Sequence, residues 1–171
     1  SRSGTTIAAA TRRSRFPGCG PRSDTMAASA PAVRAQRAKR GVNMVYGVYA
    51  PSSTPSVRQW DVDGYVLDAD TMTWFVDHYL SGVDVAHDDP GLAPLYGDLA
   101  GMPPALFTIG TLDPLVDDTL FMAARWAAAG ADATLAVYPG GVHAFDAFPI
   151  DIGLRAREAM HDFIRTAVAP H

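Results

Sequence analysis

The chain has 171 residues, 48% of them hydrophobic and 19% charged, which suits one domain of ordinary size with an apolar core. Its single cysteine, Cys19, excludes an internal disulfide and a cysteine-based metal cluster. No run of apolar residues approaches the ~18 that a membrane span requires, and the net charge of -4 argues against nucleic acid as the main partner.

The charge is unevenly distributed along the chain. Residues 1–40 hold nine Lys and Arg and one acidic residue, whereas the remaining 131 residues hold five bases and 17 acids. An organelle transit peptide and a basic nucleic-acid-binding arm are two interpretations of residues 1–24, and a solvated tail or miscalled coding sequence is favoured over both. We therefore expect two parts, a basic, disordered or miscalled segment over 1–23 and a folded domain over 24–171.

The first predicted elements follow this basic segment. The Ala- and Arg-rich stretch 26–40 predicts a helix that is kinked at Pro31 or begins there. The Val- and Tyr-rich run 42–49 predicts a buried strand, and 50–56 has the composition of a loop. A second helix is predicted over 71–80. Its apolar face recurs at helical spacing and consists of Met72, Phe75, Val76 and Tyr79.

A long irregular connection, 81–104, precedes the next strand. It contains His87, Asp88 and Asp89, which could be metal ligands. A solvated acidic loop is favoured, because no second ligand cluster is present to close a site. The sequence therefore predicts no metal and no cofactor.

The remaining elements alternate between strand and helix. Strands are predicted over 105–110 and 134–139, and helices over 117–129 and 153–167. Asp117 or Asp118 is expected to cap the first of these helices and Gly130 to end it. The apolar faces are Leu120, Ala123, Ala124 and Ala127 in the first helix, and Ala156, Ala159, Met160, Phe163, Ile164 and Ala167 in the second. This alternation predicts an α/β fold with a parallel sheet flanked by helices.

Two loops carry the candidate site residues. Asp113 follows the strand 105–110, and His143 follows the strand 134–139. Parallel strands deliver their carboxyl ends to one edge of the sheet, where open α/β sheets place ligand sites. A carboxylate there can fix the tautomer of an imidazole and stabilise its protonated form. The structural alternatives are a turn residue for Asp113 and an ordinary loop residue for His143.

Two segments together resemble the C-terminal part of an α/β-hydrolase of the hormone-sensitive-lipase-like esterase family (α/β-hydrolase fold-3). They are LAGMPPALFTIGTLDPLVDD and LAVYPGGVHAF, and the resemblance extends over about residues 26–168, most loosely over 61–100. In that family, the Asp of the Asp-Pro-Leu segment and the His after Tyr-Pro-Gly belong to the catalytic triad. The resemblance implies these roles for Asp113 and His143.

The family's nucleophilic serine is not recognisable in the sequence. No serine has glycines at both flanking positions of a Gly-x-Ser-x-Gly elbow. The expected position falls near Pro21, and Ser23, between Arg22 and Asp24, is a weak candidate. The His-Gly-Gly oxyanion loop and the first strands of the sheet are also absent from the sequence, so we expect a fragment, with a frameshifted product or a pseudoenzyme as alternatives.

The resemblance implies a carboxylic-ester hydrolase acting on small, short-acyl esters, with an amide or peptide substrate as the nearest alternative. This chain is expected to be inactive as given, for lack of the serine and the oxyanion loop. A non-catalytic relative or an association module is the second hypothesis, and a homodimer stays open because half a sheet exposes an edge. No nucleic-acid partner is expected. The cytoplasm is the favoured location.

Overall fold

The computed structural model describes residues 40–51, 54–61, 65–82 and 84–169. The elements are β1 (Val42–Val45), α2 (Pro55–Arg58), α3 (Ala69–Tyr79), the short 3-10 helix η1 (Pro94–Tyr96), β2 (Ala105–Leu112), α4 (Val116–Ala128), β3 (Ala133–Val142), the 3-10 helix η2 (Phe145–Ala147) and α5 (Asp151–Val168). The predicted helix over 26–40 and the candidate Ser23 lie outside the described residues, apart from Arg40.

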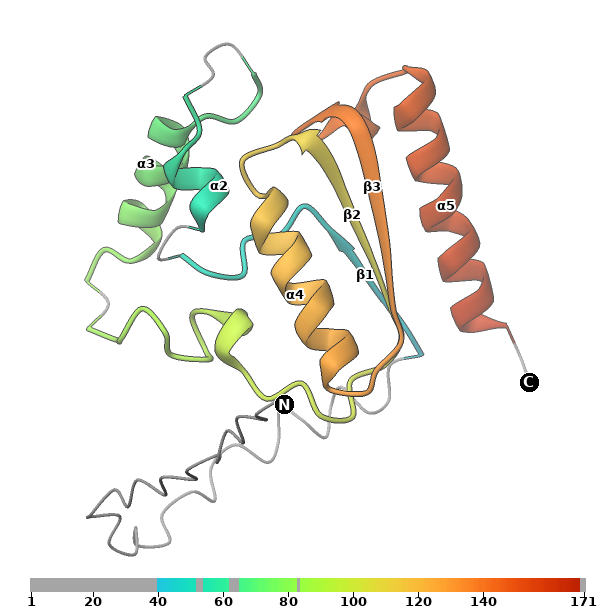
Figure 1. Ribbon diagram of the computed structural model, residues 1–171, viewed down its shortest axis with the longest axis horizontal. Helices are drawn as coiled ribbons and strands as arrows, with labels where there is room; N and C mark the ends of the chain where they lie inside the picture. The colour runs from blue at the N-terminus through green and yellow to red at the C-terminus, as the bar shows by residue number, and fades with distance from the viewer. Residues whose placement is uncertain (1–39, 52–53, 62–64, 83, 170–171) are drawn as a thin grey trace, which may run out of the picture.

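The strands form one parallel sheet in the order β1-β2-β3 (Figure 1). This confirms the parallel pairing predicted from the sequence. The strand bounds differ from the prediction, because β1 ends at Val45 rather than residue 49, and β3 runs to Val142 rather than 139. β1 stops where Tyr46 adopts a positive φ of 34°, which turns the chain out of the sheet.

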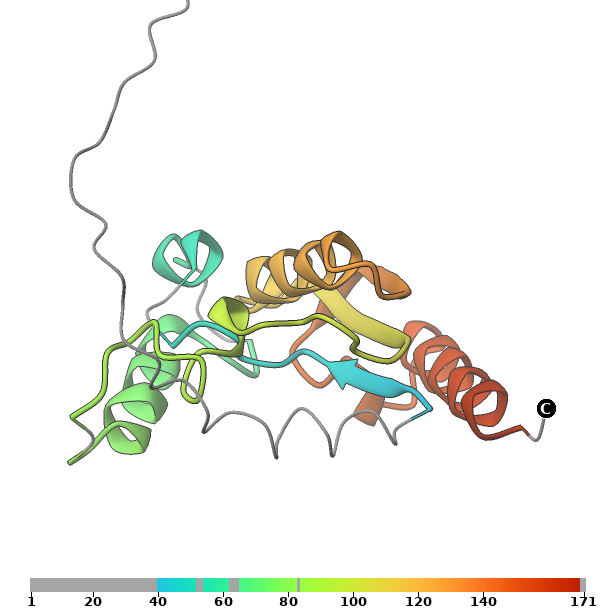
Figure 2. The ribbon, with the colours of Figure 1, turned by 90° about the horizontal axis from the view of Figure 1, so that it is seen from below.

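Helices α4 and α5 cover opposite faces of the sheet (Figure 2). Phe107 of β2 meets Trp126 of α4 edge-on, with ring centroids 5.6 Å apart. Its neighbour Leu106 points to the other face, into a cluster with Met160 of α5. Alternating side chains of β2 therefore serve the two faces, as expected for a strand buried on both sides.

The predicted buried face of α4 is confirmed at Ala123, which is buried, and wrong at Ala124 and Ala127. Ala124 and Ala127 are exposed, and the buried face lies one position earlier on the helix, at Leu115, Asp118, Thr119, Met122, Ala123 and Trp126. Burying an alanine side chain stabilises the fold only slightly. Burying Met122 and Trp126 instead removes more apolar area from water and stabilises it more. In α5 the predicted face is confirmed apart from Ile164, which is exposed.

The predicted capping of α4 is also wrong. The helix begins at Val116, one residue earlier than predicted, and its N-cap residue is Leu115, which makes no side-chain capping bond. Asp117 and Asp118 therefore sit within the first turn. Gly130 follows the helix with a positive φ of 83°, as the prediction of a C-terminal glycine required.

Asp118 joins α4 to the segment that leaves β1. Its Oδ1 accepts hydrogen bonds from the backbone N–H groups of Tyr49 and Ala50, at 2.8 and 2.9 Å, and its Oδ2 accepts from the Thr54 hydroxyl at 2.7 Å. The carboxylate is buried, and this burial raises the pKa of Asp118 despite the three donors. The bonds hold the connection between the sheet and α2.

Asp118→Ala is expected to lower the free energy of unfolding by about 3 kcal/mol, because three donors lose their acceptor in a buried place. Urea unfolding followed by circular dichroism measures the change. The matched control is Asp88→Ala at an exposed loop position, where a change of about 0.5 kcal/mol or less is expected. Equal effects at both positions would contradict the role given to Asp118.

Helices α2 and α3 lie together beside the sheet (Figure 1). α3 begins at a cap, Asp68, whose carboxylate accepts from the Thr71 N–H at 2.7 Å. Hydrogen bonding by the Thr71 side chain, and then by its backbone N–H, lowers the pKa of Asp68. Of the predicted apolar face, Met72 is buried, while Phe75 and Tyr79 are 53% and 70% exposed. No helix in the described part of the chain combines the length and apolar character that crossing a bilayer demands.

Candidate active site

Asp113 follows the last residue of β2 and is fully buried. Its Oδ1 accepts the backbone N–H of Leu115 at 2.9 Å, and its carbonyl oxygen accepts the N–H of Val116 at 3.1 Å. Asp113 is therefore a turn residue, which is the structural alternative that the sequence offered for it. The turn uses only one carboxylate oxygen, so Oδ2 is left for another partner.

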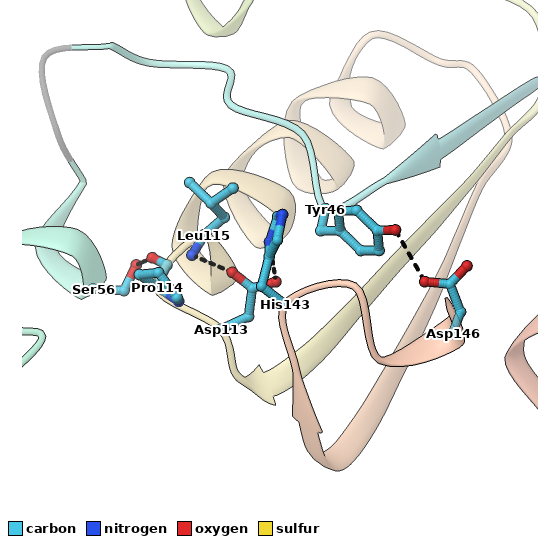
Figure 3. Close-up of polar contacts among 7 residues, drawn as sticks. All are labelled: Tyr46, Ser56, Asp113, Pro114, Leu115, His143 and Asp146. Carbon is cyan, nitrogen blue, oxygen red and sulfur yellow. Dashed lines mark hydrogen bonds and ion pairs between the residues drawn. The ribbon is translucent and has the colours of Figure 1, made fainter. Parts of the chain in front are cut away.

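That partner is His143, which follows the last residue of β3. Its Nδ1 lies 3.0 Å from Asp113 Oδ2, and 22% of its side chain is exposed (Figure 3). The contact expected between the two loops is thus present, at an ordinary hydrogen-bonding distance of about 2.6–3.2 Å.

A β-bulge between β2 and β3 places Asp113 and His143 next to each other at the sheet edge. Gly110 pairs with Tyr138, but Leu112 pairs with Val142, so β3 has two more residues than β2 between these pairs. Without the bulge, His143 would lie two residues further along the edge, or about 6–7 Å at the rise of a strand. The register shift therefore places Asp113 and His143 side by side.

Two glycines form this bulge. Gly140 has a φ of 77° and donates its N–H to the Thr111 hydroxyl at 2.9 Å. Gly141 approaches the backbone of Gly110 so closely that Gly110 has no room for a side chain, and a Cβ at Gly141 would press against Phe145 and Gly110. A glycine pair that follows an apolar run is typical of a turn that ends the strand. Instead β3 continues through them to Val142, and they shift its register.

The contact determines which ring nitrogen carries the hydrogen. An ionised carboxylate only accepts, so Nδ1 of His143 donates to Asp113 Oδ2. In the neutral imidazole, Nε2 is then unprotonated and can accept a proton. The second ring nitrogen is turned away from Asp113 (Figure 3). The arrangement is suited to general-base chemistry.

Two residues near the pair, Ser56 and Tyr46, make polar contacts that were not predicted from the sequence. Ser56 Oγ donates to the Pro114 carbonyl at 2.6 Å, while Ser56 N–H donates to Asp117 Oδ2 at 2.8 Å. On the other side, Tyr46 Oη donates to Asp146 Oδ1 at 2.9 Å (Figure 3). No motif singles out either residue, because each partner is more than 50 residues away in the chain.

A pocket of about 690 Å³ opens beside His143. It takes in the end of β1, the exposed face of α3 and the connection before η1, and its lining is mainly apolar. The residues are Val45, Tyr46, Val48, Pro51, Leu67, Met72, Phe75, Val76, Tyr79, Gly91, Leu92, Pro94, Leu115 and His143. The predicted apolar face of α3 therefore lines this pocket and is only partly buried.

The other predicted site residues lie away from this pair or outside the described residues. The serines in the described ranges are Ser56 and Ser81, and neither is hydrogen-bonded to His143. His87, Asp88 and Asp89 are all exposed. Within the part of the chain that the structure describes, no group of three or more His, Cys, Asp or Glu side chains could hold a metal ion.

The fold and the paired loops at the sheet edge define an α/β hydrolase. The family model for the alpha/beta hydrolase fold matches residues 25–147. The chain belongs to this family, and within it to the hormone-sensitive-lipase-like esterases that its motifs resemble.

The similar proteins with curated descriptions are esterases. An ethyl acetate hydrolase of Pseudomonas putida is 38% identical over 104 residues, which are 60% of this chain and 32% of that protein. An acetyl-hydrolase of Streptomyces hygroscopicus is 32% identical over 104 residues, with 60% and 34% covered. The chain thus spans about a third of the length of these relatives.

Solved structures give the same result. A thermophilic and thermostable carboxylesterase cloned from a metagenomic library superimposes with a TM-score of 0.70 at 26% identity, over 77% of this chain and 46% of that one. The esterase LipW from Mycobacterium marinum superimposes with a TM-score of 0.69 at 26% identity, over 76% and 41%.

Proposed function

We propose that the chain carries the acid–base part of a serine-type carboxylic-ester hydrolase, with His143 as general base and Asp113 as the residue that orients it. The observation that carries this proposal is the 3.0 Å contact from His143 Nδ1 to Asp113 Oδ2, made between two loops at one edge of a parallel sheet. That contact leaves Nε2 free to act on a hydroxyl.

In the proposed reaction a serine Oγ attacks the acyl carbonyl while His143 Nε2 takes the hydroxyl proton. The protonated imidazole then gives that proton to the departing alkoxide, and an acyl-enzyme remains. A water molecule, deprotonated by the same nitrogen, attacks the acyl-enzyme. The acyl–Oγ bond breaks, the imidazolium returns its proton to the serine Oγ, and the carboxylic acid is released. Asp113 stabilises the imidazolium in both steps, because its carboxylate stays against Nδ1.

The proposed reaction needs a serine nucleophile. Ser23 lies outside the described residues and lacks the flanking glycines of an elbow. We propose that the 171 residues by themselves are inactive or nearly so, since a triad without its serine keeps only residual catalysis. The serine and the oxyanion donors would then belong to the longer protein that the gene encodes.

Small ester substrates are proposed from the pocket and from the relatives. The lining is mainly apolar and includes the His143 ring, so an uncharged acyl or alkyl group fits beside the base. Two of the similar proteins are named for acetyl and ethyl acetate hydrolysis. A short acyl chain is therefore the favoured substrate class, with amides as the alternative.

The test uses the protein as its gene encodes it, together with the 171-residue chain. We expect a fluorophosphonate probe to label one serine of the former and none of the latter, and chromogenic acetate to be hydrolysed faster than octanoate. His143→Ala should abolish both signals, while the exposed His161→Ala should keep them. If no serine is labelled in either protein, the non-catalytic alternative replaces this proposal.

A further inference from the structure

The His143 ring has a second neighbour that limits its movement. One hydrogen bond at Nδ1 leaves the imidazole free to swing about the line from Nδ1 to Asp113 Oδ2. The Tyr46 ring lies 4.5 Å from the His143 ring, centroid to centroid, at an interplanar angle of 60°. Aromatic rings at this distance and angle attract each other and exclude other arrangements by contact. Together the carboxylate and the aromatic ring restrict both the position and the plane of the imidazole.

The Tyr46 ring is itself held at its far end. Its Oη donates to Asp146 Oδ1 at 2.9 Å, and this bond points away from His143 (Figure 3). Asp146 belongs to η2, three residues after His143, so the bond joins the end of β1 to the loop that carries the imidazole. The Asp146 carbonyl oxygen accepts from the Arg157 guanidinium of α5, and Phe145 beside it is fully buried. The acceptor is thus anchored from two sides.

The backbone of Tyr46 adopts a conformation that aromatic residues seldom take. Its φ is 34°, and its N–H donates to the Thr108 carbonyl at 2.9 Å, which fixes the residue to the end of β2. A left-handed conformation carries a steric cost for any residue other than glycine, because the Cβ crowds the backbone. A glycine would avoid this cost but has no ring to place against His143. Such strain persists where the surrounding structure determines it, often at functional sites.

We propose that Tyr46 is a positioning residue for His143, held in place by Asp146. This inference rests on the proposed function, because it concerns the orientation of the proposed base. The phenol acts through packing and does not reach the reacting atoms. Its hydrogen bond requires the protonated form, and burial, followed by the bond to Asp146, raises the pKa of Tyr46 to about 12.

The test reads the His143 ring directly and needs no activity. Histidine ring protons are recorded by NMR in the 171-residue chain and assigned with His143→Gln. Tyr46→Phe keeps the ring and removes the tether, and Asp146→Ala removes the acceptor. We expect both variants to shift and broaden the His143 signals in the same way. Asp146→Asn keeps an acceptor oxygen and should stay close to the wild type, and the exposed Tyr96→Phe serves as the matched control.

A kinetic arm uses the protein as its gene encodes it. Tyr46→Phe should lower kcat by about 10- to 100-fold with KM little changed, because a misoriented base affects the transition state and not ground-state binding. Unchanged His143 signals in folded Tyr46→Phe and Asp146→Ala overturn the positioning role, whatever the kinetics show. Shifted signals in a protein that hydrolyses no ester keep the positioning role and contradict the proposed function instead.

Discussion

Asp113→Asn is expected to lower kcat for short-chain esters by about ten-thousand-fold, in the protein as its gene encodes it, with the fold intact. The geometry explains both halves of this expectation. The Leu115 N–H needs an acceptor at 2.9 Å, so the asparagine oxygen stays at the place of Oδ1. The amide nitrogen must then face His143 and donates to Nδ1. The hydrogen moves to Nε2, and the base can no longer take a proton.

Initial rates with a chromogenic acetate measure the loss, and circular dichroism verifies the fold. The exposed Asp88→Asn makes the same chemical change in a loop away from the pair, and it should alter kcat by less than about two-fold. A folded Asp113→Asn protein with wild-type kcat would show that this carboxylate serves the turn alone. His143 would then need another partner to act as a base.

Most of the sheet and the candidate pair could be predicted from the sequence. β2 and β3 are apolar runs with a helix between them, and this pattern requires a parallel pairing. Asp113 and His143 could be singled out because each follows such a run and because the flanking motifs resemble one esterase family. These patterns lie within short stretches of the chain, so they can be recognised without a structure.

The features that could not be predicted depend on register and on distant contacts. The sequence of the bulge at Gly140 and Gly141 looks like that of an ordinary turn, because glycine is common in bulges and in turns. Tyr46 looks like one more apolar strand residue, and its positive φ is visible only in the structure. Ser56 and Asp118 bond across the fold to segments more than 50 residues away. The error in the α4 face has another cause, since a run of alanines gives no strong periodicity.

Gly110→Ala is expected to destabilise the protein by about 3 kcal/mol or more, because the new methyl group has no space. A Cβ at Gly110 would lie 2.8 Å from the Cα of Gly141 and closer still to its carbonyl oxygen. These are backbone atoms of the neighbouring strand, so no side chain can rotate away, and β2 and β3 must separate. The strands would separate at the bulge, which lies between Gly110 and Leu112 of β2. The separation therefore disturbs the register that places Asp113 beside His143.

Gly130→Ala is the matched control for this substitution. Gly130 has a φ of 83°, and no atom lies within 4 Å of the place that a methyl group would take, so only the backbone strain of about 1 kcal/mol applies. Urea unfolding compares the two variants, and the His143 ring signals report the register. Gly110→Ala should lose stability and shift these signals, whereas Gly130→Ala should lose little and leave them in place. Equal losses of about 1 kcal/mol, with unmoved signals, would mean that the two strands do not approach this closely in solution, and the bulge could not then be what aligns the pair.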